Sequence, residues 1–187
     1  MTLGYAFCGS FCTHKRSLDM LRVILKNGYS VVPIMSETVY ATDTRFGTAK
    51  TLINEVSGLC GHEVIHTIVQ AEPLGPQIKL DALIVSPCTG NTLAKMANGI
   101  TDTAVSMAAK AHLRSNRPLI IALASNDALS SNLKNIGAML TRKSVYFVPM
   151  EQDEPVEKPH SLIADFTLLP DTLEAALAGN QYQKVFK

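Results

Sequence analysis

The chain has 187 residues, of which 47% are hydrophobic and 18% are charged, with a formal net charge of +1. This length predicts one domain over residues 1–187. Because no block of like charges occurs, we expect neither a nucleic-acid partner nor a charged membrane surface as a partner. No apolar run approaches the ~18 residues of a membrane span and no basic start precedes an apolar segment, so a cytoplasmic protein is expected.

Cysteine usage gives no sign of a metal centre. The four cysteines form no CxxC pair and no zinc-ligand spacing with the five histidines. We therefore expect no metal site, and we expect reduced thiols, as is usual in the cytosol. The cysteines are Cys8, Cys12, Cys60 and Cys88.

Short apolar runs typical of strands alternate with stretches of helical spacing along the whole chain. The predicted strands are 5–8, 29–35, 64–69, 82–85, 119–123 and 145–149. The predicted helices are one between the first two strands, 38–61 with breaks, 93–100, 103–113, 129–140 and 173–177. This order predicts an α/β fold: a doubly wound, mostly parallel sheet of about six strands with helices on both faces, Rossmann-like or flavodoxin-like. An acidic, proline-bearing loop at 151–159 and a C-terminal tail at 181–187 carry little structural information.

The segment 86–102 joins a buried strand to a helix through a turn rich in small and hydrogen-bonding residues. Residues 82–85 are continuously apolar, as expected of a parallel strand covered on both faces, and Pro87 is expected to stop pairing at its carboxyl end. The strand-to-helix turn then falls at 89–92. Free backbone N–H groups and hydroxyls at such a turn can hold an anion or a planar heterocycle.

A second candidate loop follows the first strand. Gly9, Ser10 and Thr13 lie where α/β folds usually bind phosphate. The pattern G-x-G-x-x-G is absent, so a single phosphate is favoured over a dinucleotide pyrophosphate. The alternative is that Ser10 or Thr13 is simply a helix N-cap.

Further candidates lie at the ends of the neighbouring strands. Ser36 would face the same crevice, where its hydroxyl can meet a ribityl or ribose chain, and Glu37 resembles the acidic residue that binds a nicotinamide ribose. The alternative is a helix cap with Glu37 solvated. Asn126, at another strand exit, is a ligand candidate because its amide both donates and accepts, although asparagine is also common in turns.

Two other residues near the turn have simpler explanations. Cys88 has no nearby histidine or cation in sequence to lower its pKa, so we expect a packed small residue rather than a nucleophile. Lys95 could reach back to the turn or to an adjoining subunit. By default we expect it to lie on a solvated helix face, with Asp102 two helical turns away.

Together these residues resemble the flavoprotein family that includes phosphopantothenoylcysteine decarboxylase, peptidyl-cysteine decarboxylases and flavin prenyltransferases. The resemblance covers nearly all of 3–150. Its most specific part is 87–92 with Lys95, Gly99 and Asp102, which is similar to the family signature P-A-S/T-A-N-T…K…A…G-I…D. The resemblance implies FMN bound at a subunit interface in a homo-oligomer, a trimer or a multiple of one. The residues that it assigns to the cofactor are Gly9, Ser10, Phe11, Ser36, Cys88, Thr89, Gly90 and Asn91.

Within this family the chain most closely resembles a subfamily whose members act with a nicotinamide-binding subunit. Together the two subunits form dipicolinate from a dihydrodipicolinate-type precursor in spore-forming bacteria. The resemblance rests on 87–95, 98–103 and 146–149. It implies a subunit of an oxidoreductase, a small dicarboxylate as ligand, and NAD(P) on the partner subunit.

Two departures weigh against the decarboxylase activity of the wider family. The stretch 75–81 is short and lacks the catalytic histidine that the decarboxylases carry before their fourth strand. Their substrate clamp P-x-M-N-x-x-M-W is represented at most by Asn126, which is the one candidate for substrate binding. Catalytic residues therefore stay unassigned. An FMN-dependent decarboxylase of the cysteine type and a non-catalytic ligand-binding or scaffold subunit remain the alternatives.

The predicted crevice offers only neutral hydrogen-bond donors. The nearest cations along the chain, Lys95, Arg114 and Arg117, lie too far along the helix or beyond it to form a bidentate clamp on a dicarboxylate. We therefore expect charge recognition to come partly from another subunit.

Overall fold

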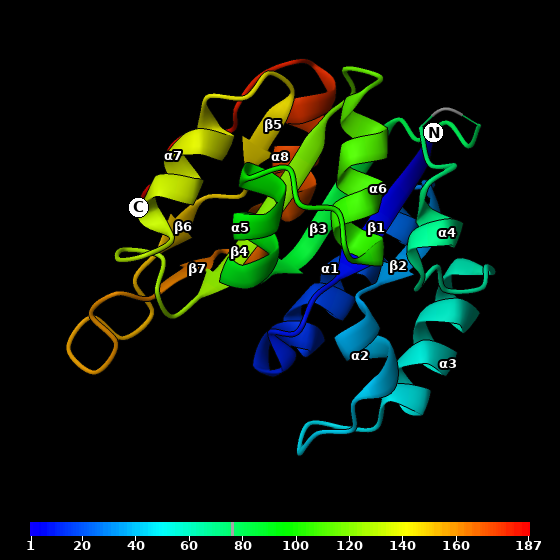
Figure 1. The fold of residues 1–187 in the computed structure, drawn as a ribbon, viewed down its shortest axis with the longest axis horizontal. Coiled ribbons are helices and arrows are strands. Elements are labelled where there is room, and N and C mark those ends of the chain that lie inside the picture. Colours follow the sequence, from blue (N-terminus) through cyan, green and yellow to red (C-terminus); the bar gives the residue numbers. More distant parts are fainter. Residues whose placement is uncertain (76) are drawn as a thin grey trace.

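In a computed structural model, which describes residues 1–75 and 77–187, a central sheet is covered by helices on both faces (Figure 1). Seven strands are found among these residues, in the order β2-β1-β3-β4-β7-β6, and β5 also pairs with β4. The strands are β1 (Thr2–Phe7), β2 (Ser30–Met35), β3 (Ala82–Cys88), β4 (Leu119–Ser125), β5 (Val145–Phe147), β6 (Met150–Glu151) and β7 (Leu162–Ala164). The first five pair in parallel, which confirms the predicted mostly parallel α/β sheet.

The helices alternate with the strands. One sheet face is covered by α1, α3 and α8, and the other by α4, α5, α6 and α7. The α-helices are α1 (His14–Lys26), α2 (Glu37–Ala41), α3 (Ala49–Cys60), α4 (Ile68–Ala71), α5 (Gly90–Ala97), α6 (Ala104–Leu113), α7 (Leu133–Leu140) and α8 (Leu169–Leu177). Two short 3-10 turns, η1 (Phe11–Thr13) and η2 (Phe166–Leu168), precede α1 and α8.

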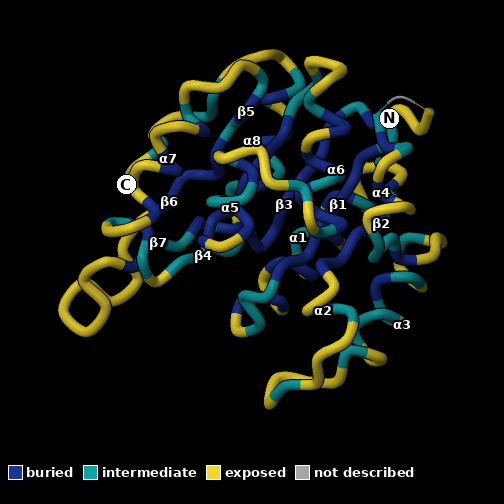
Figure 2. Tube along the Cα trace, viewed as in Figure 1, coloured by how far each residue is buried: buried dark blue, intermediate teal, exposed yellow. Residues whose placement is uncertain are grey.

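The core consists of two apolar layers separated by the sheet. Because side chains alternate along a strand, Leu83 and Val85 of β3 pack into one layer, whereas Ala82 and Ile84 pack into the other. All four side chains are fully buried. Figure 2 shows the same burial along the central strands. The continuous apolar run of β3 is therefore explained by cover on both faces.

A buried hydrogen-bond chain holds α1 against β1 and β3. The Tyr5 hydroxyl donates to the Ser17 carbonyl at 2.8 Å, and the Ser17 hydroxyl donates to the Ser86 carbonyl at 2.6 Å. Burial raises the pKa of Tyr5 to about 12, so the phenol stays a donor at any physiological pH. The start of α1 is thus fixed relative to the carboxyl ends of both strands.

The predicted strand at 64–69 is wrong. Only Ile65 pairs, through an isolated parallel bridge to Ile34, and Ile68 begins α4. The physical reason is a capping box: the Thr67 hydroxyl accepts from the Gln70 N–H, and the Gln70 side chain accepts from the Thr67 N–H. This local arrangement favours a helix over the β-branched character of the segment.

The prediction that Pro87 stops pairing is also wrong. β3 continues to Cys88, which pairs with Leu123 after an irregularity in the register beyond Val85. Although Pro87 has no N–H to donate, its carbonyl accepts from the Cys8 N–H at 3.2 Å. The strand therefore stays attached to β1 up to the start of the functional turn.

The C-terminal third differs most from the prediction. β6 and β7, which flank the loop expected at 151–159, were not predicted, and β7 pairs antiparallel with the end of β4. The residues expected as a tail return to the sheet: Gln181 hydrogen-bonds both the N–H and the carbonyl of Phe147, and Phe186 forms a bridge with Met150. The predicted helices at 129–140 and 173–177 begin instead at Leu133 and Leu169.

Neither a membrane-spanning helix nor a metal-binding cluster is found among the described residues. None of the helices in the part of the chain that the structure describes is long and apolar enough to cross a membrane. Within the same residues no group of three or more His, Cys, Asp or Glu side chains is arranged to hold a metal ion. Pro76, within the stretch 75–81 that lacks the decarboxylase histidine, lies outside the described residues.

Candidate functional site

Three strand exits meet around one cleft of about 500 Å³. They follow β1, β3 and β4, whose carboxyl ends lie at the same edge of the parallel sheet, the place where open α/β sheets bind ligands. Two loops form the outer walls: the turn after α2 and the loop between β6 and β7. Both project beyond this edge (Figure 1). The predicted residues that line the cleft are Gly9, Ser10, Phe11, Thr89, Gly90, Asn91 and Asn126.

Ser36 and Cys88 do not line this cleft. Ser36 is buried as the N-cap of α2, where its hydroxyl accepts from the Val39 N–H at 3.4 Å. Cys88 is fully buried, and burial raises the pKa of its thiol well above the ordinary value. A thiol in this state is a packed small side chain and not a nucleophile.

The β1 exit offers one free hydroxyl. Thr13 donates to the Ser10 carbonyl at 2.8 Å, whereas the Ser10 hydroxyl has no hydrogen-bond partner among the described residues. Ser10 and Thr13 occupy the N-cap positions of η1 and α1, as the N-cap alternative has it, but neither hydroxyl accepts a hydrogen bond from a backbone N–H. Ser10 is therefore the side chain of this loop that is available to a phosphate.

His14 follows the loop but lies outside the cleft. Its Nε2 is 2.8 Å from the Cys8 carbonyl oxygen, and its ring packs edge-on against Phe7 and close to Phe11. Burial lowers the pKa of His14, so the ring is neutral near pH 7. No histidine is found among the described residues that line the cleft, which leaves the site without the usual general base.

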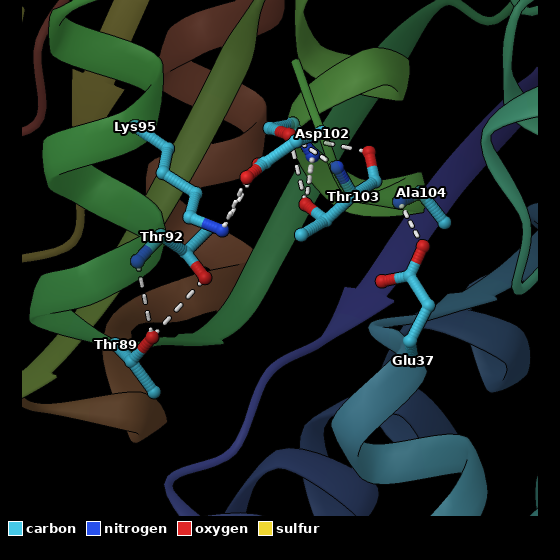
Figure 3. Close-up of polar contacts among 8 residues, drawn as sticks. Glu37, Thr89, Thr92, Lys95, Asp102, Thr103 and Ala104 are labelled. Atoms are coloured by element: carbon cyan, nitrogen blue, oxygen red, sulfur yellow. Dashed lines mark hydrogen bonds and ion pairs between the residues drawn. The ribbon is translucent and has the colours of Figure 1, made fainter. Parts of the chain in front are cut away.

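The β3 exit is capped by Thr89, which is the N-cap of α5. Its hydroxyl accepts from the Thr92 N–H at 3.2 Å and donates to the Thr92 hydroxyl at 3.1 Å (Figure 3). The first N–H groups of α5, those of Gly90 and Asn91, have no partner within the helix, and both residues line the cleft. This helix start can therefore stabilise negative charge.

Gly90 is required by packing at the start of α5. A Cβ atom at this position would lie 2.3 Å from the Ser125 Oγ and 2.8 Å from the Asp127 Oδ1. Distances this short are not tolerated between non-bonded heavy atoms. The absence of a side chain thus lets the β3 exit and the β4 exit lie directly against each other.

Asp127 organises the β4 exit. Its carboxylate accepts from Ser125 at 2.5 Å, from Ser131 at 2.7 Å and from the Asn132 amide at 2.9 and 3.0 Å. These bonds, led by that of Ser125, hold the pKa of Asp127 below its usual range. The group is an ionised anchor for the loop. Asp127 was not among the predicted site residues, although Asp after a strand is a common turn residue.

Glu37 and Lys95 form structural contacts near the cleft. The Glu37 carboxylate accepts from the Ala104 N–H at 2.8 Å, which places a negative charge at the N-terminus of α6, and Lys95 lies 2.9 Å from an Asp102 carboxylate oxygen (Figure 3). The helix-cap alternative is confirmed, because Ser36 caps α2 and Glu37 is exposed, although its carboxylate also contacts α6. Lys95 does not reach the turn.

The residues present fit a phosphorylated, planar cofactor. The side chains of Ser10, Asn91 and Asn126 line the cleft and form no hydrogen bond to any described residue. The cleft volume lies in the range of small-molecule sites, about 300–1,000 Å³. A free hydroxyl, two free amides and a helix start are suitable donors for a phosphate and a polar chain.

A family model described as Flavoprotein matches residues 2–168, and the chain therefore belongs to the flavoprotein family. The dipicolinate synthase B subunit of Bacillus subtilis (strain 168) is 39% identical to it over 183 residues, which are 98% of this chain and 92% of that protein. The crystal structure of the dipicolinate synthase B subunit from Bacillus halodurans matches with a TM-score of 0.91 at 40% identity and covers 100% of this chain and 95% of that one.

More distant structures share the fold. A dodecameric FMN-dependent UbiX-like decarboxylase from Escherichia coli O157:H7 matches with a TM-score of 0.65 at 24% identity, over 80% of each chain. The chain is thus a flavoprotein similar along its whole length to dipicolinate synthase B subunits, and its likeness to the decarboxylase is one of architecture.

Proposed function

We propose that this chain is the flavoprotein-type subunit of a dipicolinate synthase and forms dipicolinate together with a nicotinamide-binding A subunit during sporulation. The observation that carries the proposal is the similarity to dipicolinate synthase B subunits, at 39% and 40% identity, over essentially the whole chain. The protein acts as one domain in the cytoplasm. Its substrate is a small cyclic dicarboxylate of the dihydrodipicolinate type.

The cofactor in this proposal is FMN. Gly9, Ser10 and Phe11 would hold its phosphate, with Ser36 and the turn at 88–91 nearby. Free donors at Ser10 and Asn91 and the unpaired N–H groups at the start of α5 support this placement. When bound, FMN supplies a two-electron acceptor; NAD(P) is bound by the partner subunit.

Asn91 tests this placement, because it is exposed at the cleft and forms no hydrogen bond to the described residues. Asn91→Phe should abolish FMN binding, measured by quenching of flavin fluorescence, and leave the circular dichroism spectrum unchanged. Asn54→Phe, on an exposed face of α3 outside the cleft, is the matched control. Equal FMN affinity in both variants would place the flavin elsewhere.

The reaction is the oxidation of a dihydropyridine-type ring to an aromatic one. The ring loses one hydride and one proton, and a bound flavin or nicotinamide would supply the acceptor for the hydride and its two electrons. Aromatisation provides driving force, so the main task of the protein is to orient the C–H bond towards the acceptor and to exclude water. No histidine lines the described cleft, so the proton passes to solvent, to a group of the partner subunit or to one of the two carboxylates that line the cleft, Asp127 and Asp153.

Two alternatives compete with this function. An FMN-dependent cysteine-type decarboxylase is disfavoured because the stretch 75–81 has no histidine and none lines the described cleft. A non-catalytic scaffold or ligand-binding subunit would leave the partner fully active on its own. Separate activity measurements on the two subunits therefore distinguish the alternatives.

The test combines this chain, reconstituted with FMN, with a nicotinamide-binding A subunit, a nicotinamide cofactor and the dihydro precursor. Dipicolinate is detected by its ultraviolet absorbance. We expect product only when both subunits are present at physiological concentrations. If this chain alone converted the precursor at a rate that the partner did not change, it would be a self-contained flavin dehydrogenase or oxidase and the two-subunit proposal would fail.

A further inference from the structure

The turn between α2 and α3 presents Arg45 and Phe46 at a fixed tip. Thr44 and Gly47 exchange two backbone hydrogen bonds, at 3.0 and 3.1 Å, so the turn is closed on itself. The Thr44 hydroxyl accepts from the Phe46 N–H at 3.1 Å, and the Asp43 carboxylate accepts from the Ala49 N–H at 2.9 Å. The tip is therefore held by local hydrogen bonds and does not depend on packing of its two side chains.

Phe46 lies between two cavities. It lines the cleft of about 500 Å³ and a second cavity of about 560 Å³ between α1 and α3, together with Phe11 and Cys12. Even so, 55% of its surface is exposed. A large aromatic side chain held at an exposed tip costs free energy unless another surface covers it. Because Phe46 lies at the wall of the cleft, a ligand bound in the cleft would cover its exposed side chain.

Arg45 is the available cation of the cleft. Its guanidinium lies 4.9 Å from the centre of the Phe46 ring and forms no ion pair with any described residue. The other cation that lines the cleft is Lys158, on the opposite loop. Lys158 already pairs with Glu154 at 3.1 Å and with Asp153 at 3.6 Å. An anionic ligand in the cleft would therefore meet an unpaired charge at Arg45.

We propose that Arg45 and Phe46 form the carboxylate clamp of the cleft: Arg45 binds one carboxylate of a cyclic dicarboxylate, and Phe46 packs against the face of its ring. A guanidinium matches a carboxylate with two parallel hydrogen bonds, and its contact with Phe46 holds it in place for that bond. The identity of the dicarboxylate rests on the proposed function. Because Arg45 and Lys158 line the cleft, the expectation that the crevice offers only neutral donors is wrong.

The experiment measures the affinity of the full chain for dipicolinate by calorimetry. Arg45→Ala should weaken binding at least tenfold, Arg45→Lys should fall between it and the native chain, and Phe46→Ala should weaken binding about fivefold to tenfold. Arg16→Ala is the matched control, because Arg16 is exposed on α1 and lines neither cavity. Picolinate, with one carboxylate, should depend on Arg45 in the same way, and pyridine should not bind.

A fluorescent variant gives a second readout. The chain contains no tryptophan, so Phe46→Trp introduces a single reporter at the tip. Dipicolinate should shift its emission, and the shift should need at least tenfold more ligand when Arg45→Ala is added. FMN affinity is measured separately in all variants, because Arg45 and Phe46 line the same cleft as the phosphate loop.

Three outcomes would overturn the clamp. The first is equal dipicolinate affinity in Arg45→Ala and the native chain; the second is no binding of either carboxylate by the native chain. The third is an unchanged affinity in Phe46→Ala together with loss of the oligomer on a sizing column, which would assign the tip to a contact between protomers. Failure of FMN binding or of product formation with the A subunit would instead count against the proposed function. The ratio of dipicolinate affinities between the native chain and Arg45→Ala would still decide the clamp.

Discussion

At Gly90, the close packing of the β3 exit against the β4 exit depends on the absence of a Cβ atom. A Cβ there would lie 2.3 Å from Ser125 and 2.6 Å from the Asn132 amide. Gly90→Ala should therefore lower the free energy of unfolding by about 1–3 kcal/mol, as is usual for overpacking. Urea denaturation measures the change. Gly58→Ala is the control, because its Cβ meets nothing within 4 Å in the middle of α3, and it should stabilise the chain by up to about 1 kcal/mol.

Asp127 makes stability depend on pH. Hydrogen bonds from Ser125, Ser131 and Asn132 hold its folded pKa below the ordinary value of about 3.9. A depressed folded pKa contributes stability above the unfolded pKa, and this contribution is lost as pH falls through the folded pKa. The difference in unfolding free energy between the native chain and Asp127→Asn should thus be largest near neutral pH and shrink below about pH 4. A difference that stayed constant in urea titrations from pH 7 to pH 2.5 would contradict this.

The loops after β1 and β3 could be predicted at the level of single residues because glycine, serine and asparagine immediately follow buried strands there. The packed state of Cys88 was also predictable, since no cation or histidine lies near it in sequence. Arg45, Phe46 and Asp127 were not predicted as site residues. Arg45 and Phe46 reach the cleft only through the path of a loop, and at the β4 exit only Asn126 was predicted as a ligand residue.

Among the elements, α2 and α6 are joined through Glu37. Its carboxylate accepts from the Ala104 N–H at 2.8 Å and adds a negative charge at the N-terminus of α6, where Thr103 and Ser106 already form a capping box. Glu37→Ala should lower the free energy of unfolding by about 1 kcal/mol in the absence of any ligand. Glu37→Gln, which keeps the acceptor, should lose less.

The control for Glu37 is Glu63→Ala, because Glu63 is exposed and forms no hydrogen bond or ion pair with the described residues. It should change stability by less than about 0.5 kcal/mol. If Glu37→Ala were equally neutral in chemical denaturation but weakened binding of a nucleotide, the ribose-binding interpretation of Glu37 would replace the helix contact.

The prediction of elements succeeded where apolar residues recur at a regular spacing, because one face or both faces of the element are buried. The apolar runs of β3 and β4 gave the first residues of these strands, and the helical spacing of α6 gave that helix nearly at its observed bounds, whereas β3 continues three residues beyond its predicted end. It failed at 64–69, where a capping box overrides β-branched residues. It also missed β6 and β7, because strands of two and three residues carry no periodic signal and exist only by pairing with each other and with the end of β4.

At the scale of the whole molecule, the strand order explains why a site exists at all. The chain passes from β1 to β2 on one side and returns to β3 on the other, so the loops that leave β1 and β3 diverge and open a crevice at the carboxyl ends. This much follows from the alternation of strands and helices. The outer walls do not, because neither the turn at 44–47, which is closed by its own hydrogen bonds, nor the loop between β6 and β7 carries a periodic signal in the sequence.

Self-association is the remaining expectation for the whole molecule. The family resemblance implies a homo-oligomer, and the segment that joins α5 to α6 carries an apolar side chain to the surface: Ile100 is 47% exposed beside Met96 and Leu113 in a cavity of about 340 Å³. We expect the chain alone to form a trimer or a multiple of one that buries this segment.

Ile100→Asp should shift the oligomer towards monomer on a sizing column at micromolar concentration, because a charge placed in a buried apolar contact is unfavourable. Val69→Asp is the matched control: Val69 is 83% exposed on α4, away from this segment, and its substitution should leave the oligomer intact. A native chain that elutes as a monomer, or an Ile100→Asp variant that elutes like the native oligomer, would show that this surface is not the contact and that the cleft is completed without it.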